Sequence, residues 1–173
     1  DALRPDAEPD LPIEFGRAIT PGTWTFPAVT SVHTGTYPHE HTAVAHTTPE
    51  DETFVIPGQA SPDLTLPEAL ESSGYDTYAG LGFMTPYLAM RGWYQTHRVY
   101  SDTRAEQVVS GYEKWRHNRD RTFGYIHLGD LHAPIDPPES YVEQRGVDTS
   151  IRDLANLNRF TDDYDGSSEC TRF

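Results

Sequence analysis

A helix followed by a buried strand is the first clear hydrophobic pattern in the chain. From Leu64 to Ser73 apolar residues recur at helical spacing, and Gly74 stands where a helix C-cap belongs. The next segment, Tyr75 to Phe83, is apolar enough to predict a buried strand. Together these segments predict one helix-to-strand step of an α/β fold.

The same order repeats further along the chain. Asp102 to Arg119 has the best helical pattern, and its predicted apolar face consists of Val108, Val109, Tyr112 and Trp115. Thr122 to Leu128 follows as a strand and leads into Gly129-Asp130-Leu131-His132. Helices and strands alternating at this spacing predict parallel strands joined by crossovers. Chemistry in such sheets collects at the carboxyl ends of strands, where we expect His132 to lie.

The first third of the chain is less regular. Ile13 to Ile19 predicts a short strand, which Thr20-Pro21-Gly22 breaks. A short helix is predicted from Phe26 to Thr34, with Thr25 as its N-cap and Pro27 in its first turn. Residues 1–12 and 36–62 are interpreted as loops, apart from one candidate strand at Thr53–Ile56.

The charge balance restricts the expected partners. Acidic residues outnumber basic ones by 27 to 13, which gives a formal net charge of −14. Such a surface repels nucleic acid phosphates and anionic membranes, so neither is an expected partner. The acidity fits either a surface that favours solubility or adaptation to high salt. Because Lys114 is the only lysine, the composition favours a salt-adapted, halophilic protein.

Cysteine content and hydropathy indicate the compartment. The single cysteine, Cys170, excludes an internal disulfide framework and suits a reducing cytosol. No apolar run reaches the length that spans a bilayer. The expected location is therefore cytoplasmic, with no membrane segment within this chain.

Candidate chemistry is concentrated between Thr25 and Gly35. A hydroxyl at a helix N-terminus lies among backbone N–H groups and at the positive end of the helix dipole. That environment stabilises an alkoxide and also holds a tetrahedral anion such as phosphate or sulfate. Taken alone, however, a threonine ahead of a short helix is most simply a capping residue.

This segment resembles the signature of the sulfatase and alkaline phosphatase superfamily, Cys/Ser-x-Pro-Ser-Arg followed after four residues by Thr-Gly. Pro27, Thr34 and Gly35 match in register, which puts Thr25 at the nucleophile position. Further segments resemble family motifs in the family's order, and these are Asp1–Asp6, Tyr37–His41, Leu66–Thr77 and His127–Pro134. The resemblance implies a three-layer α/β fold, alkaline-phosphatase-like, with a mostly parallel sheet flanked by helices.

The resemblance also implies an activity and a site. It implies hydrolysis of sulfate or phosphate esters, small or on glycans, by a metal-activated Thr25. Asp1, with Thr25, would bind a divalent metal ion (Ca, Mg, Mn or Zn), and His132 would contact the anionic group of the ester.

Four histidines, His33, His39, His41 and His46, lie close together in the sequence. Their spacing fits no closed zinc site, and histidines in a polar loop are interpreted as exposed. Of these, His41 is the one expected to face the site and bind substrate.

Departures from the signature change the implied chemistry. Threonine replaces the family's Cys or Ser, so conversion to formylglycine is not expected. Val29 replaces the arginine that supports formylglycine, and Ala28 replaces the serine. Ala2 stands where many sulfatases have a second metal-binding aspartate. This pattern resembles the superfamily's phosphodiesterases and phospho-group transferases more than its true sulfatases.

The family's later metal ligands, an Asp-His or Asp-Asn motif, are not recognisable. Asp162-Asp163 is interpreted as part of a solvated acidic loop. We therefore expect an incomplete, truncated catalytic domain over residues 1–160, followed by an acidic tail over 161–173. Two alternatives stay open: a phosphoglycerol- or phosphoethanolamine-type transferase of the same superfamily, and a catalytically inactive remnant.

Overall fold

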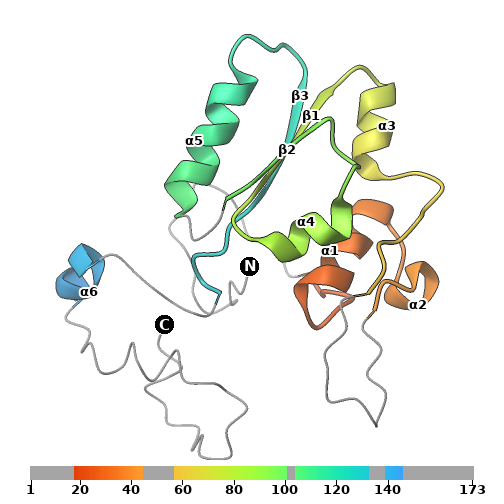
Figure 1. The fold of residues 1–173 in the computed structure, drawn as a ribbon, viewed down its shortest axis with the longest axis horizontal. Helices are drawn as coiled ribbons and strands as arrows, with labels where there is room; N and C mark the ends of the chain where they lie inside the picture. The colour runs from red at the N-terminus through yellow and green to blue at the C-terminus, as the bar shows by residue number, and fades with distance from the viewer. Residues whose placement is uncertain (1–17, 45–56, 101–103, 133–138, 146–173) are drawn as a thin grey trace, which may run out of the picture. The chain divides into compact units, whose positions relative to one another are not determined.

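Three parallel strands form the centre of the fold. The computed structural model describes residues 18–44, 57–100, 104–132 and 139–145. Its strands, β1 (Asp76–Leu81), β2 (Thr96–Val99) and β3 (Thr122–His127), form one sheet in the order β2-β1-β3. Both β2 and β3 run parallel to β1, which confirms the predicted parallel α/β architecture (Figure 1).

Helices cover both faces of this sheet. One face carries α5 (Ala105–Arg116), whereas α1 (Thr25–Thr34), α3 (Leu66–Ser72) and α4 (Met84–Met90) lie on the other (Figure 1). A short helix, α2 (Pro38–His41), contacts α1. The arrangement is the three-layer α/β fold expected from the sequence.

Two compact units divide the chain. Glu14–Leu128 forms one unit, which holds the sheet and α1 to α5. Asp1–Ile13 and Gly129–Phe173 form the other, which includes α6 (Glu139–Arg145). None of the helices in the described ranges has the length and apolarity that a membrane crossing would need.

Side chains of β1 alternate between the two helical layers. The ring of Tyr78 packs against Tyr112 and Trp115 of α5, with centroid separations of 5.8 and 5.0 Å. Ala79 and Leu81 point to the other face, where they join the main hydrophobic core. Because both faces are covered, the strand is buried continuously from Thr77 to Leu81 rather than on alternate residues.

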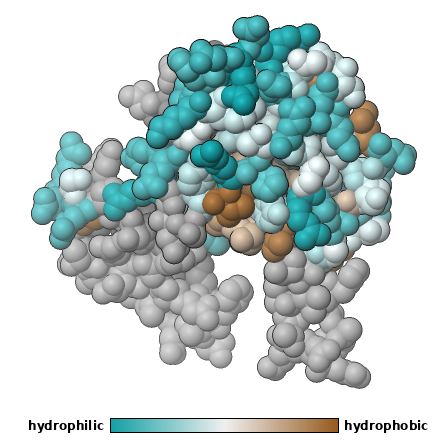
Figure 2. Space-filling view, turned by 45° about the horizontal axis from the view of Figure 1, so that its top comes forward, coloured by the Kyte–Doolittle hydropathy of each residue, from teal (hydrophilic) through white to brown (hydrophobic). Residues whose placement is uncertain are grey.

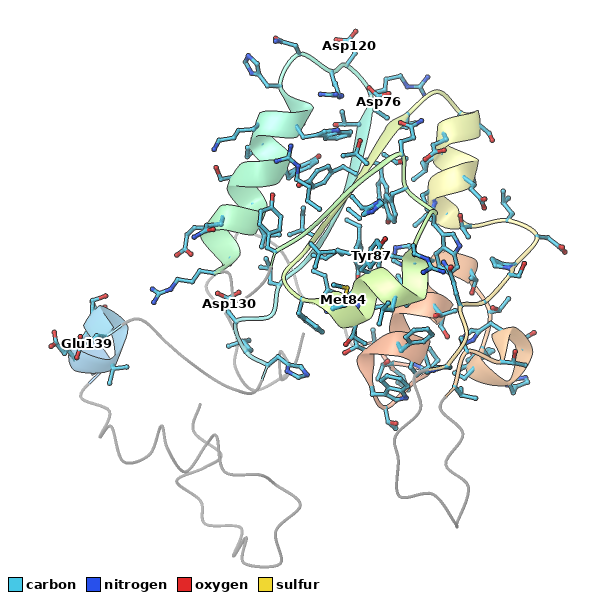
Figure 3. All side chains as sticks on the ribbon, viewed as in Figure 1. Asp76, Met84, Tyr87, Asp120, Asp130 and Glu139 are labelled. Atoms are coloured by element: carbon cyan, nitrogen blue, oxygen red, sulfur yellow. The ribbon has the colours of Figure 1, made fainter. Side chains whose placement is uncertain are left out.

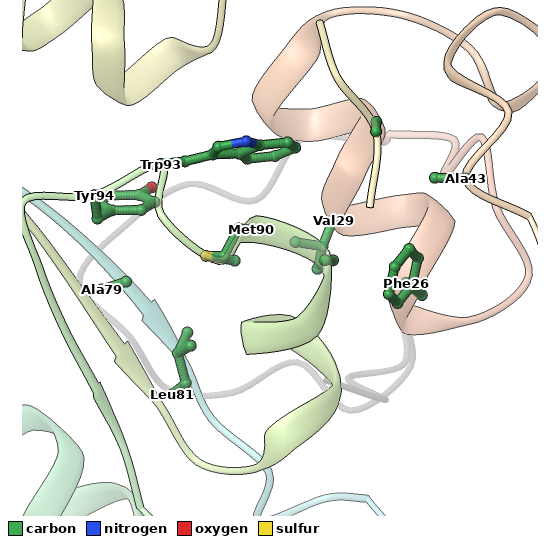
Figure 4. Packing of buried hydrophobic residues seen from close by; sticks show 10 residues of the cluster. Phe26, Val29, Ala43, Ala79, Leu81, Met90, Trp93 and Tyr94 are labelled. Atoms are coloured by element: carbon green, nitrogen blue, oxygen red, sulfur yellow. The ribbon is translucent and has the colours of Figure 1, made fainter. Parts of the chain in front are cut away.

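The main core lies between the sheet and α1 with α4. It gathers Phe26 and Val29 from α1, Met90 from α4, Trp93 and Tyr94 from the segment after α4, and Ala79 and Leu81 from β1 (Figure 4). Full burial of one large apolar side chain contributes about 1.5–3 kcal/mol. This core therefore fixes α1 against the sheet.

Several predicted elements agree with the structure to within a few residues. The helix predicted from Leu64 forms as α3, with Thr65 as its N-cap and Gly74 at a φ of 80° just beyond its end. The strands predicted around β1 and β3 also form. On α5, Val108 is fully buried as predicted, but Val109 is 41% exposed, because the buried face is narrower than the apolar pattern suggested.

Other parts of the structure differ from the predictions. The segment interpreted as a loop contains α2, which starts at Pro38 and in which the Glu40 carboxylate accepts a hydrogen bond from the Tyr37 N–H at 2.7 Å. The sequence also gave no sign of α4 or β2. Ala18 and Ile19, the described part of the strand predicted from Ile13, form no strand. The candidate strand at Thr53–Ile56 lies outside the described residues.

Hydrophilic residues cover most of the face drawn in Figure 2, and hydrophobic residues there form small separate spots. The ion pairs at the surface are solvent-exposed: Glu113 and Arg116 lie 2.7 Å apart, and Asp76 and Arg119 lie 3.6 Å apart. Exposed pairs of this kind contribute at most about 1 kcal/mol. Stability therefore comes mainly from the two buried layers beside β1.

Replacing Gly124 with alanine tests the packing of α5 on β3. A Cβ at this position would overlap the ring of Tyr112, so the ring or the strand must move. We expect the free energy of unfolding to fall by about 1–3 kcal/mol, measured by urea denaturation. Gly58→Ala is the control, because a Cβ there meets nothing within 4 Å. It should change the free energy by no more than about 0.5 kcal/mol, and equal effects of the two variants would contradict this packing.

Candidate active site

Thr25 is the first residue of α1. Trp24 is the N-cap, in an extended conformation with φ −149° and ψ 167°, and its carbonyl accepts a hydrogen bond from the Ala28 N–H at 3.3 Å. The prediction that Thr25 is the N-cap is therefore wrong by one residue, because the helical conformation begins one residue earlier than expected. Thr25 still lies in the first turn, where N–H groups have no partner within the helix and the dipole is positive.

The face of α1 that carries Thr25 points into the protein. Thr25, Val29 and His33 are spaced by four residues and so line one side of the helix. Val29 is 4% and His33 2% exposed, Thr25 is half-buried, and Val32 on the opposite side is 61% exposed. The candidate nucleophile is thus on the side of α1 that faces the sheet.

The matching signature residues shape the helix. Pro27 is buried in the first turn, where its missing N–H costs no helical hydrogen bond. Gly35 ends the helix with a φ of 68°, and its N–H donates to the Ser31 carbonyl at 2.9 Å. The Thr34 hydroxyl donates to the Thr30 carbonyl at 2.9 Å. These residues set where α1 begins and ends, and thereby place Thr25.

His41 holds α2 against the middle of α1. Its Nδ1 accepts the Ala43 N–H at 3.0 Å, so Nε2 carries the proton and donates to the Ser31 hydroxyl at 2.9 Å. Partial burial lowers the pKa of His41 below 6.5, which favours this neutral ring. A role for His41 in substrate binding stays a prediction.

His33 is the candidate site residue whose exposure the sequence patterns predict wrongly. It was grouped with exposed histidines, but it is buried because it follows Val29 by one turn on the inward face of α1. Its Nδ1–H donates to the Val29 carbonyl at 2.8 Å, and its Nε2 lies 2.8 Å from the Tyr94 hydroxyl. The i, i+4 spacing of His33 from Val29, an apolar residue of the same helix, is the signal that points to this burial. His39, by contrast, is exposed and stacks on Tyr37.

Aromatic and histidine side chains also gather on β3. The Tyr125 hydroxyl lies 2.7 Å from Nδ1 of His127, and the edge of the Tyr125 ring meets His33 with centroids 4.7 Å apart. Burial raises the pKa of Tyr125 to about 12, so this phenol stays protonated. His127 pairs with Leu81 across the sheet, at the carboxyl ends of β3 and β1.

Two aspartates lie at the amino ends of the strands, opposite the end that carries His127. Asp76 begins β1 and Asp120 precedes β3, whereas Met84 and Tyr87 lie on α4, beyond the carboxyl end of β1 (Figure 3). A carboxylate at the amino end of the strands is far from the usual place of chemistry in parallel sheets.

His132 follows β3 in a tight turn. Its N–H donates to the Gly129 carbonyl at 2.8 Å, and both Asp130 and His132 are exposed. The turn belongs to the unit that starts at Gly129. A role for His132 in binding the ester stays a prediction.

The divalent ion expected from the resemblance would be held by carboxylate, hydroxyl or imidazole groups. Asp1 lies outside the described residues, and Thr25 is the expected ligand that the structure describes. Within the described ranges, no three His, Cys, Asp or Glu side chains gather in a way that could hold a metal ion.

Comparison with known protein families gave one match. The family model described as Sulfatase matches residues 6–171, which is nearly the whole chain. No curated protein and no solved structure matched.

The burial of His33 predicts a dependence of stability on pH. Burial is the largest cause that lowers the pKa of His33 below 6.5, and the nearby His127 lowers it further, whereas the bond to Val29 raises it. The folded state then binds fewer protons than the unfolded state. Stability is complete above pH 6.5 and falls as the pH drops towards the pKa of the folded state.

Urea denaturation between about pH 7.5 and about pH 5 measures this effect. His33→Gln removes the titrating ring, so its free energy of unfolding should fall less over the same range than that of the unaltered chain. Parallel pH dependences for the two proteins would contradict the assignment.

Proposed function

Because the chain belongs to the sulfatase family, we propose that it acts on sulfate or phosphate esters with Thr25 as the attacking nucleophile. The observation that carries the proposal is the placement of Thr25 at the start of α1, within a signature whose Pro27, Thr34 and Gly35 shape that helix. The proposal concerns the chemistry of the chain's own residues.

The reaction is a group transfer to the threonine hydroxyl. The Thr25 oxygen forms a bond to the sulfur or phosphorus of the ester while the bond to the leaving oxygen breaks, and the proton that the Thr25 hydroxyl loses is balanced by the proton that the departing alcohol gains. Water then cleaves the threonine ester and releases the inorganic anion. Because threonine cannot form the hydrated aldehyde of formylglycine, attack by the hydroxyl itself is the available route.

The start of α1 contributes electrostatically to this step. The helix has ten residues, so its dipole places partial positive charge at the first turn. A developing alkoxide and the oxygens of a tetrahedral anion are both stabilised there. One charge at such a helix end gains about 0.3–1 kcal/mol at an exposed site and more when partly buried, as Thr25 is.

We assign the remaining predicted residues supporting roles. His132 would bind a nonbridging oxygen of the ester, and His41 would line the substrate side of α2. Asp1 and Thr25 would hold the divalent ion that family membership implies. When bound, such an ion polarises the ester and lowers the pKa of a coordinated hydroxyl.

Replacing Thr25 with alanine tests the nucleophile. Turnover of 4-nitrophenyl sulfate and 4-nitrophenyl phosphate should fall by about 10³-fold or more, because no other group replaces the lost oxygen. Thr25→Ser retains a hydroxyl and should keep measurable turnover. Thr23→Ala is the matched control, since it removes the same atoms from an exposed residue just before the helix, and it should leave kcat/KM unchanged.

Circular dichroism of each variant establishes that α1 and the sheet remain folded. Full turnover by a folded Thr25→Ala variant would remove Thr25 from the mechanism.

Removing divalent ions tests the metal. Dialysis against EDTA should abolish turnover of both esters, and adding back Ca²⁺, Mg²⁺, Mn²⁺ or Zn²⁺ one at a time should restore it for the ion that fits. Turnover that survives exhaustive chelation would contradict a metal-dependent reaction.

A further inference from the structure

His33 connects the helix of the candidate nucleophile to the sheet. Thr25 and His33 lie two turns apart on the inward side of α1, and His33 is 2% exposed. The ring makes one hydrogen bond to its own helix, at the Val29 carbonyl, and one to the Tyr94 hydroxyl, which lies outside the helix. The second bond spans 61 residues of sequence and ties α1 to the segment that enters β2.

The two hydrogen bonds of His33 determine which of its ring nitrogens carries the proton. The Val29 carbonyl can only accept, so Nδ1 of His33 carries the proton. Burial lowers the pKa of His33, which leaves Nε2 without a proton and able to accept from the Tyr94 hydroxyl. Burial also raises the pKa of Tyr94, which keeps its hydroxyl protonated as the donor. The Val29 carbonyl, the two ring nitrogens of His33 and the Tyr94 hydroxyl then each have a defined role as donor or acceptor.

The far end of the network is held by the sheet. The Tyr94 ring stacks on Phe123 of β3 at 6.3 Å with an interplanar angle of 10°. The next residue, Gln95, donates its N–H to the Thr77 hydroxyl of β1 at 3.0 Å. His33 also meets the edge of the Tyr125 ring. The Tyr94 hydroxyl is thus a fixed point to which α1 is attached.

Directional bonds decide how α1 is rotated about its axis. Phe26 and Val29 of α1 make apolar contacts in the core, which are not directional, and the buried Ser31 bonds to His41 of α2 rather than to the sheet. Hydrogen bonds weaken steeply when their angle departs from linear. The bond between His33 and Tyr94 therefore resists rotation of the helix, and rotation would carry the Thr25 oxygen away from its position.

We propose that His33 is a positioning residue, which through Tyr94 fixes the rotation of α1 and with it the direction of the Thr25 hydroxyl. This inference rests on the proposed role of Thr25. His33 does not touch the ester, so its loss lowers the rate of attack more than it weakens substrate binding.

Three variants test the proposal in the full chain with 4-nitrophenyl phosphate. His33→Leu should lower kcat by about 10- to 100-fold, because small misplacements of a reacting group cost that much. KM should stay within about threefold. His33→Gln, whose side-chain oxygen can accept the Tyr94 hydroxyl, should recover most of the rate. Tyr94→Phe removes the same bond from the other side and should lower kcat about as much as His33→Leu.

The pair forms a double-mutant cycle. If the two residues act through their bond, the variant with both His33→Leu and Tyr94→Phe is no slower than either single variant. Val108→Ala is the stability control, because Val108 is fully buried on α5, on the opposite face of the sheet. It should leave kcat unchanged below its unfolding temperature. Equal rate losses in Val108→Ala and His33→Leu, or no recovery with glutamine, would overturn the proposal.

Amide hydrogen exchange separates this proposal from the proposed function. His33→Leu should speed exchange of the hydrogen-bonded amides of α1 relative to those of β1, whereas Val108→Ala should not. Unchanged exchange in α1 would overturn the positioning role whatever the activity. Failure of the proposed function has a different result, namely full turnover by Thr25→Ala while His33→Leu still loosens α1.

Discussion

The burial of β1 is the constraint on which the rest of the structure depends. This strand pairs on both edges and is covered on both faces, so its side chains from Thr77 to Leu81 must fit a helical layer. Tyr78 meets the rings of α5, and Leu81 meets the core beneath α1 and α4. Because interiors are packed at crystal-like density, the position of α1 follows from the surface that β1 presents.

The helix of the candidate nucleophile, α1, is held by two kinds of contact with different consequences. Phe26 and Val29 supply apolar burial, which brings α1 to the sheet but allows it to slide or turn. The bond between His33 and Tyr94 adds a direction. A catalytic group needs both, since attack depends on the angle as well as the distance at which the oxygen meets the ester.

The family signature has a structural meaning beyond its chemistry. Pro27 and Gly35 fit the start and the end of α1 for reasons of backbone geometry, because proline suits a first helical turn and glycine suits a left-handed C-cap. At the position of the family's arginine, Val29 is a core residue whose carbonyl accepts a hydrogen bond from the Nδ1–H of His33.

Local patterns determined several elements without help from the tertiary structure. Short stretches of sequence predict the capped helix α3, the strand β1 and the register of Thr25 with Gly35. In each stretch, propensity, capping and turn residues favour the same structure. Two elements were not predicted by those local patterns. The helix α4 has seven residues and the strand β2 four, so neither is long enough to show a clear period.

The roles of the histidines were decided only in the folded chain. The sequence by itself determined the position of Thr25 in its motif and the residues that share the motif. It did not show that His33 is buried or that His41 bonds to Ser31. Such outcomes depend on which distant side chains share a face. The Tyr94 hydroxyl, to which His33 bonds, belongs to a residue 61 positions further along the chain. Only the folded structure brings the two side chains together.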